Sequence, residues 1–252
     1  MKQFYSFLLL LAATVLTGAV QAQTINGDLN HNGDLDVDDI TLLINGYLTG
    51  EKEYFNGEGD KDNEYVDLGL SVKWATMNVG ANAPEEYGDY FAWGETKPKD
   101  DYELSTYKWC NDSYNELTKY CTDSDYGIND NKTVLDLVDD AAHVNWGGSW
   151  RMPTHDEWKE LKEKCNWKWT TQNGVKGRRV TGPNGNSIFL PAAGYRWGDS
   201  LYDEDNGGSY WSSSLFPDYF SDAYDLYFDS DNAECDYSSD RRYGHSVRAV
   251  CP

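Results

Sequence analysis

Apolar residues recur with a helical period in one segment near the middle of the chain. Thr154 and Glu157 have the spacing of a capping box, in which an N-cap threonine and a glutamate three residues later satisfy free backbone N–H groups. Trp158, Leu161 and Cys165 then fall on one face of the expected helix. The pattern predicts a helix that begins after Thr154 and packs its apolar face inward.

Short runs with a two-residue period predict strands from residue 65 onward. In one run, Tyr224, Leu226 and Phe228 alternate with Asp225 and Tyr227, so the first three are expected to be buried and the other two to face solvent. The strands predicted in this way are residues 71–76, 175–181, 187–190, 210–215, 224–228 and 246–250. With a second helix expected over 134–144, the elements indicate an α+β domain with few helices and a twisted, mostly antiparallel sheet.

The start of the chain has the pattern of a targeting segment. Residues 1–22 contain one lysine, an apolar run over 4–16 and small residues at Val20 and Ala22, where a signal peptidase would cut. A transmembrane anchor is the alternative interpretation, but a span needs roughly 20 apolar residues. We therefore expect residues 1–22 to be a cleaved signal peptide and the product to be secreted, extracellular or held at the cell surface without membrane insertion.

A twelve-residue segment after this leader has the ligand spacing of a calcium loop. Residues 28–39 place oxygen side chains at positions 1, 3, 5, 9 and 12, and Gly33 at position 6, where such a loop must turn sharply. An apolar helical face follows over 40–48. An acidic loop without metal is the alternative. The expected Ca²⁺ ligands are Asp28, Asn30, Asn32, Asp34, Asp36 and Asp39, with Asp34 acting through its backbone carbonyl.

This loop and the helix after it resemble the calcium-binding repeat of dockerin modules. Dockerins carry two such repeats, whereas the acidic stretch 56–63 lacks the spacing of a second one. The resemblance implies Ca²⁺ as a cofactor and a cohesin-like partner, and the missing repeat puts that partner in doubt. The chain is thus divided into a dockerin-like repeat over 24–50, a polar linker over 51–64 and a main domain over 65–252.

The charge balance excludes several classes of partner. The chain has 21 Lys and Arg against 43 Asp and Glu, a net charge of -22, so its field repels nucleic acid and anionic membrane surfaces and attracts cations. An aromatic content of 15% nevertheless predicts a folded domain, because these side chains supply burial that disordered chains lack.

Five cysteines belong to the main domain, and an oxidising compartment would allow disulfides. Cys110 with Cys121 would close a short loop, Cys165 with Cys251 would tie the expected helix to the C-terminus, and Cys235 would remain single. The alternative is that all five are reduced and packed. No Cys-x-x-Cys pair is present in the sequence, which disfavours a zinc or redox motif.

Five blocks of the main domain resemble, in order, the Fibrobacter major paralogous domain family, common in secreted proteins of gut Bacteroidetes. They are YVDLGLSVKWA at 65–75, NWGGSWRMPT at 145–154, LPAAGYR at 190–196, YWSSS at 210–214 and SVRAVCP at 246–252. The family is similar to the C-type-lectin-like fold shared by formylglycine-generating enzymes and by the receptor-binding proteins that retroelements diversify. The resemblance implies a binding scaffold whose frame presents side chains from the segments between the C-terminal blocks.

Those segments mix aromatic residues with small polar ones, as antibody paratopes do, although some of the aromatics would instead belong to the core. The expected ligand-binding residues are Trp197, Tyr202, Phe216, Tyr219, Phe220, Tyr227, Tyr237, Tyr243 and His245. The sequence has no His-Glu-x-x-His, Gly-x-Ser-x-Gly or phosphate-loop motif, so no catalytic residues are assigned. We expect a non-catalytic binding protein for an extracellular protein or glycan. The alternatives are an accessory scaffold of polysaccharide degradation, recruited through the dockerin-like repeat, and an enzyme of the formylglycine-generating type.

Overall fold

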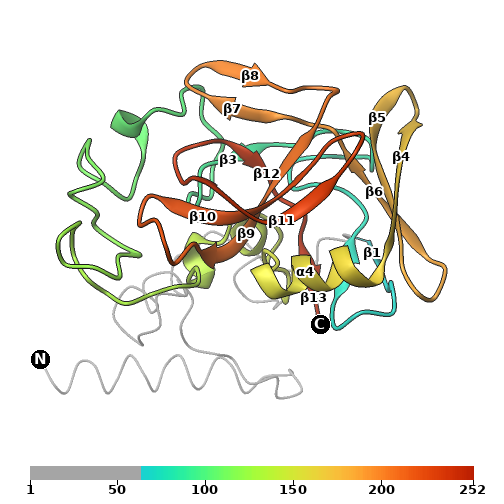
Figure 1. Ribbon diagram of the computed structural model, residues 1–252, viewed down its shortest axis with the longest axis horizontal. Coiled ribbons are helices and arrows are strands. Elements are labelled where there is room, and N and C mark those ends of the chain that lie inside the picture. Colours follow the sequence, from blue (N-terminus) through green and yellow to red (C-terminus); the bar gives the residue numbers. More distant parts are fainter. Residues whose placement is uncertain (1–63) are drawn as a thin grey trace, which may run out of the picture. The chain divides into compact units, whose positions relative to one another are not determined.

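A computed structural model describes residues 64–252 of the chain (Figure 1). The predicted signal peptide, the calcium ligands from Asp28 to Asp39 and all but the last residue of the linker lie outside the described residues. Within the described part, the fold is mostly β-sheet with two α-helices and two short 3₁₀ turns. The sheet-rich α+β class predicted from the sequence is therefore confirmed for this part of the chain.

A five-stranded sheet forms the centre of the domain, in the order β11-β10-β9-β12-β3. Strands β9, β10 and β11 follow one another as an antiparallel meander, while β12 runs parallel to β9 and antiparallel to β3. Central strand β9 is buried along almost its whole length, because both of its faces are covered. The strands are β3 (Tyr90–Phe91), β9 (Gly208–Leu215), β10 (Asp222–Phe228), β11 (Ala233–Asp240) and β12 (His245–Ser246).

Two three-stranded antiparallel sheets and a hairpin complete the β-structure. One sheet pairs β4, β5 and β6, and the other places β2 between β1 and β13. Hairpin β7–β8 lies beside the central sheet, above β12 in Figure 1. Their bounds are β1 (Tyr65–Val66), β2 (Lys73–Ala75), β4 (Asn166–Gln172), β5 (Val175–Thr181), β6 (Ser187–Pro191), β7 (Tyr195–Trp197), β8 (Ser200–Tyr202) and β13 (Val250–Cys251).

Helix α4 (His155–Lys164) begins where the capping box predicts it, and both reciprocal hydrogen bonds between Thr154 and Glu157 are formed. Trp158 and Leu161 are fully buried on its inner face. The helix predicted over 134–144 forms instead as a 3₁₀ turn, η3 (Leu137–Asp139), followed by α3 (Ala141–Trp146). Asp140 ends the turn and caps α3 by accepting a hydrogen bond from the backbone N–H of His143.

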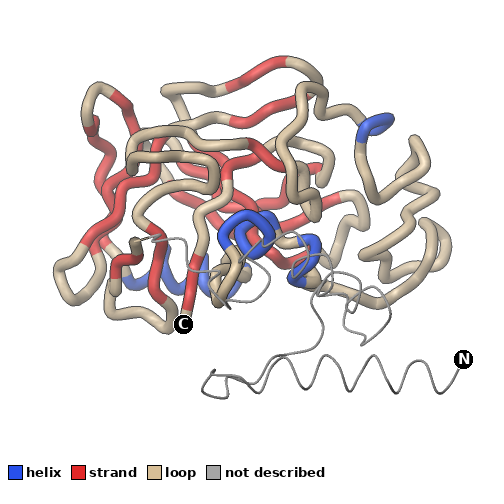
Figure 2. The backbone as a smooth tube through the Cα atoms, turned by 180° about the vertical axis from the view of Figure 1, so that it is seen from behind, coloured by secondary structure: helices blue, strands red, loops and turns tan. Residues whose placement is uncertain are grey.

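Long loops join β3 to η3, interrupted by the 3₁₀ turn η2 (Leu104–Thr106) and by isolated β-bridges such as Cys110 with Leu117 (Figure 2). Aromatic side chains from these loops fill one part of the core, with Tyr102 and Tyr107 both buried. Their hydroxyls donate to the backbone carbonyls of Tyr90 and Trp93, respectively. The loops are therefore anchored to β3 and its continuation by buried hydrogen bonds as well as by packing.

Arg248 joins three segments of the described domain through buried hydrogen bonds. Its guanidinium is fully buried and donates to the carbonyls of Ala75 and Phe189 and to the side-chain oxygen of Asn78. Burial lowers the pKa of Arg248 to about 10, but the group stays charged at neutral pH. One cation thus fixes three chain segments that are far apart in the sequence.

The predicted disulfides are wrong. Cys110, Cys121, Cys165 and Cys235 are free thiols, so neither the Cys110–Cys121 nor the Cys165–Cys251 pair is formed. Cys110 and Cys121 instead pack in the loop core with the buried tyrosines. The second interpretation of the sequence, reduced and packed cysteines, describes these four.

Two strand predictions also need correction. The strand predicted over 246–250 is divided into β12 and β13. The backbone between them forms hydrogen bonds outside the strand ladders, since the carbonyls of Val247 and Ala249 accept from the backbone N–H groups of Val79 and Ala75. In β10, Asp225 was predicted to face solvent but is only 2% exposed. The second face of β10 is covered too, and the ladders on both sides of the strand shift register at Asp225.

Candidate functional site

A pocket of about 240 Å³ opens between the central sheet and hairpin β7–β8. Backbone hydrogen bonds in both directions between Arg196 of β7 and Gly244, just before β12, hold the hairpin against the sheet. The pocket draws side chains from β7, β9, β10, β11, the turn after β11, and β12. Its lining is Tyr195, Ser209, Asp225, Tyr227, Tyr237, Ser238, Ser239, Tyr243 and His245.

Local sequence explains why this place is hollow. Three serines line it, Ser209 of β9 and Ser238 and Ser239 of β11, and they leave space that larger side chains would fill. The chain enters β7 through Gly194, which has φ +64° and lies so close to the carbonyl of Tyr202 that a Cβ would approach its oxygen to 1.9 Å. Only glycine fits that turn, and the turn sets where the hairpin lies.

An acid and a histidine form the floor of the pocket. The Oδ2 atom of Asp225 lies 3.7 Å from Nδ1 of His245 and accepts a hydrogen bond of 3.2 Å from the Ser239 hydroxyl. The imidazole stacks on the ring of Trp211, with centroids 4.0 Å apart and planes inclined by 17°. Asp225 Oδ1 and His245 Nδ1 are both buried without a hydrogen-bond partner among the described residues.

Burial sets the protonation of this pair. Loss of water raises the pKa of Asp225 to about 7, and it lowers the pKa of His245 to about 3. The distance of 3.7 Å would suit an ion pair but exceeds that of a hydrogen bond. Burial disfavours both charged forms, so between about pH 3 and pH 7 the acid of Asp225 is protonated and the imidazole of His245 is neutral.

Aromatic rings continue from the pocket to the surface. Tyr195 stacks on Tyr202 at 5.6 Å and on Tyr243 at 5.8 Å, and Trp197 lies 6.0 Å from both of these partners. We call these four residues the aromatic rim. Trp197 of the aromatic rim is 42% exposed, and Tyr237 of β11, which lines the pocket, is 55% exposed. Large apolar surfaces are therefore available to a ligand at the mouth of the pocket.

The structure brings together six of the nine predicted ligand-binding residues. Tyr227, Tyr237, Tyr243 and His245 line the pocket, although His245 lies at the floor and is not displayed. Trp197 and Tyr202 belong to the aromatic rim.

The other three predicted residues lie outside the pocket lining. Tyr219 is 62% exposed and stacks on Phe216, while Phe220 stacks on Tyr126 and packs against the loop core.

Sequence reasoning missed Asp225, Tyr195 and the three serines as site residues. Strand alternation assigned Asp225 to the solvent face, and Tyr195 lies in a block that was assigned to the frame. The available signal was an acid inside the apolar run Tyr224 to Phe228, since a charged residue in a covered strand is uncommon without a functional partner.

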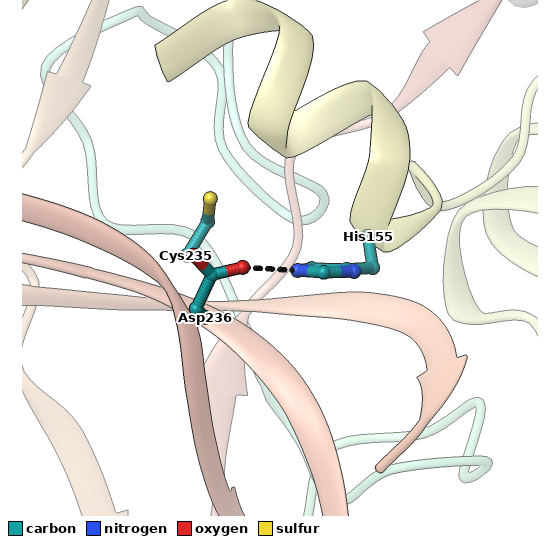
Figure 3. Close-up of side chains that lie close together, drawn as sticks. All are labelled: His155, Cys235 and Asp236. Carbon is teal, nitrogen blue, oxygen red and sulfur yellow. Dashed lines mark hydrogen bonds and ion pairs between the residues drawn. The ribbon is translucent and has the colours of Figure 1, made fainter. Parts of the chain in front are cut away.

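A second group of polar side chains lies where helix α4 meets β11. His155 Nε2, Cys235 Sγ and a carboxylate oxygen of Asp236 are all within 4.8 Å of one another and could hold a metal ion (Figure 3). A β-bulge places two neighbouring residues near the same helix end, because Cys235 and Asp236 of β11 oppose Leu226 alone on β10.

Each of these three residues also has a packing role. Asp236 Oδ1 and His155 Nε2 point toward one another and lie 3.0 Å apart (Figure 3). The imidazole stacks on Tyr224 at 3.8 Å. Cys235 is buried among apolar residues, and burial raises the pKa of its thiol to about 11, which opposes the thiolate form that metals bind. The arrangement supports attachment of α4 to the sheet more strongly than it supports a metal centre.

No protein-family model matches the chain, and neither the curated proteins nor the solved structures compared with it contain a match. Within residues 64–252, no helix is both long and apolar enough to cross a membrane. By its own residues, the described part is a sheet-rich α+β domain that carries an aromatic-lined pocket above a buried acid and histidine.

Proposed function

We propose that this protein is a secreted or cell-surface binding protein without catalytic activity, and that its protein or glycan ligand enters the pocket above Asp225. The observation that carries the proposal is the lining itself, in which four tyrosines and three serines surround two buried polar groups. Binding sites of this kind combine aromatic contact area with a few fixed polar groups. Tyrosine and serine are also the residues that paratopes use most.

The contrast between buried and displayed residues supports the same proposal. Blocks assigned to the frame are buried, as Leu190, Trp211 and Ser246 show at 0% exposure, whereas Trp197 and Tyr237 between the blocks are exposed. A rigid frame with displayed aromatics is what the resemblance to the Fibrobacter major paralogous domain family and to C-type-lectin-like domains implies. We include that family and fold in the proposal.

Binding has better support than hydrolysis, although the pocket contains serine, histidine and aspartate. Among the described residues, no serine hydroxyl is hydrogen-bonded to His245, and Ser239 donates to Asp225 instead. The pKa of His245, lowered to about 3, makes the imidazole too weak a base to activate a hydroxyl near neutral pH. A formylglycine-type reaction has little support either, since Cys235 is buried with a raised pKa.

A panel of glycans and extracellular proteins, tested with single alanine variants, would examine the binding proposal. Tyr227→Ala and Tyr237→Ala remove pocket walls. Each is expected to lower the affinity for a true ligand about thirtyfold, the usual loss at a central aromatic contact. Tyr219→Ala is the matched control, because Tyr219 is exposed but lies outside the lining. Equal affinity for all three variants and the wild type would count against the pocket.

The N-terminal loop supplies a second, separate part of the proposal. The ligand spacing from Asp28 to Asp39 supports binding of one Ca²⁺ ion. Recruitment to a polysaccharide-degrading assembly through a cohesin-like partner remains the alternative function. Pull-down with cohesin domains, with and without a calcium chelator, separates the alternatives, because only recruitment requires calcium-dependent capture.

A further inference from the structure

Two polar atoms at the pocket floor have hydrogen-bonding capacity that the described residues do not use. Asp225 Oδ1 and His245 Nδ1 are buried, and both residues line the pocket. A buried polar atom without a partner costs about 1–3 kcal/mol, and among the residues that line the pocket these two side-chain atoms are the ones in that state. The two atoms come from different strands, β10 and β12. Both would have a hydrogen-bond partner if a ligand supplied N–H or O–H groups.

The sign of the surrounding charge restricts what that ligand is. Among the residues that line the pocket there is no lysine or arginine, so an ionised Asp225 has no counter-charge within it. Nearby cations are already engaged: Arg196 lies over the ring of Tyr90, and Arg242 pairs with Glu103 and Asp240. The net charge of -22 further raises the local concentration of cations and lowers that of anions.

We propose that the pocket above Asp225 binds an organic cation, an alkylammonium or guanidinium group, whose N–H groups donate to Asp225 Oδ1 and to His245 Nδ1. A neutral imidazole with its proton on Nε2 accepts such a bond at Nδ1. The tyrosine walls suit the same ligand, because aromatic rings attract cations and contact the alkyl chain. The inference rests on the proposed binding function and specifies the group that enters the pocket. A lysine or arginine side chain of a protein ligand supplies such a group, and a small free amine or guanidine has the same chemistry.

Binding of a cation has a consequence for the proton on Asp225. In the empty pocket, burial keeps the pKa of this carboxyl near 7, and a bound cation favours the ionised form. The other titratable groups around it are Asp222 on the same strand, His245 on β12 and the four lining tyrosines. Since His245 is neutral above about pH 4, cation binding at pH 6 is expected to release a proton that comes from Asp225.

Calorimetric titration of the full chain in calcium-saturated buffer tests the inference. The probes are n-butylammonium and N-butylguanidinium, with 1-butanol and methyl glucoside as neutral controls. Titrations in two buffers of different ionisation enthalpy give the protons released. We expect about 0.9 proton per cation at pH 6 and about 0.1 at pH 8, from the pKa of about 7. This readout uses the wild-type chain and does not depend on how any variant folds.

Asp225→Asn keeps the shape of the side chain and removes its charge. This variant is expected to lower the affinity for both cations by about tenfold to a hundredfold, because a hydrogen bond to a charged group is lost. It is also expected to abolish proton release. Asp218→Asn is the matched control, because it makes the same charge change at an exposed residue outside the lining. A lysine peptide compared with its Nε-acetyl form shows whether a partner's side chain is accepted as well as a free amine.

The possible results separate this inference from the proposed function. Failure of both cations to bind, or unchanged cation affinity in Asp225→Asn, overturns the inference. A glycan or protein that binds wild type and Asp225→Asn equally but is lost in Tyr227→Ala would overturn the cation assignment while supporting the pocket as a binding site. Cation binding with proton release at pH 6 that Asp225→Asn removes supports both.

Discussion

Asp225→Asn also changes how stability depends on pH, and the size of the change follows from burial. The carboxyl has a pKa of 3.8 in an exposed reference state and about 7 in the fold. Because the folded pKa is raised, the protonated acid stabilises the fold fully below pH 3.8, and this contribution is lost as pH rises through 7. The difference between the two pKa values corresponds to a loss of about 4 kcal/mol in the free energy of unfolding. The Asp225→Asn variant does not undergo this loss, because the asparagine side chain does not titrate.

His245 has the opposite sign. Its folded pKa of about 3 lies below the usual 6.5, so the neutral imidazole contributes stability that is present above pH 6.5 and is lost as pH falls toward 3. The contribution amounts to about 5 kcal/mol. In the wild type, the two groups therefore nearly cancel between pH 4 and pH 6.5. Each single variant is expected to reveal the pH dependence of the group that remains.

Urea unfolding followed by tryptophan fluorescence measures this, since all 10 tryptophans lie at position 74 or beyond and report on the described domain. Relative to wild type, the free energy of unfolding of Asp225→Asn is expected to rise by about 4 kcal/mol from pH 4 to pH 8. That of His245→Gln is expected to fall relative to wild type by about 4 kcal/mol from pH 3 to pH 7. Parallel curves for the three proteins would refute the assignment of a buried neutral pair.

Three further predictions concern helix α4, the buried Arg248 and the N-terminal loop. Glu157→Ala removes one half of the capping box and the ion pair with Arg151, so thermal unfolding should show a loss of about 1–2 kcal/mol, while the exposed Glu163→Ala should leave stability unchanged. Arg248→Ala leaves buried carbonyls unpaired and should cost about 3 kcal/mol or more in urea unfolding, whereas an effect of the same size from the exposed Arg179→Ala would contradict this reasoning. Calcium is expected to slow proteolysis within residues 24–50, and protection that persists unchanged in Asp28→Ala would show that the loop is not its binding site.

Local sequence signals were sufficient wherever a short segment determines its own structure. The capping box fixed the start of α4, because the two reciprocal hydrogen bonds involve residues three apart. Strand β5 has the predicted bounds, and β9 and β10 extend the predicted strands by two residues each. By contrast, β4 and β11 were not predicted. Their sequences alternate weakly, and their extended form depends on pairing with β5 and β10.

The candidate site was only partly accessible from sequence because its residues come together through long-range contacts. The aromatic character of the segment 197–245 was visible, and six of its nine predicted residues gather at the pocket or the aromatic rim. The acid at its centre was assigned to the wrong face, since a period of two cannot show that a strand will be covered on both sides. Burial, and with it the raised pKa of Asp225, depends on neighbours that are distant in sequence.

The sequence by itself determined the sheet-rich α+β class of the described domain, the start of α4 and the richness of the C-terminal segment in aromatic residues. These features follow from periodicity, capping and composition, which act over a few residues. Only the tertiary structure decided that Asp225 and His245 are buried 3.7 Å from one another, that four cysteines stay free, and that Phe216, Tyr219 and Phe220 lie outside the pocket. Each of these depends on which strands become neighbours, and that is a property of the whole chain packed around its core.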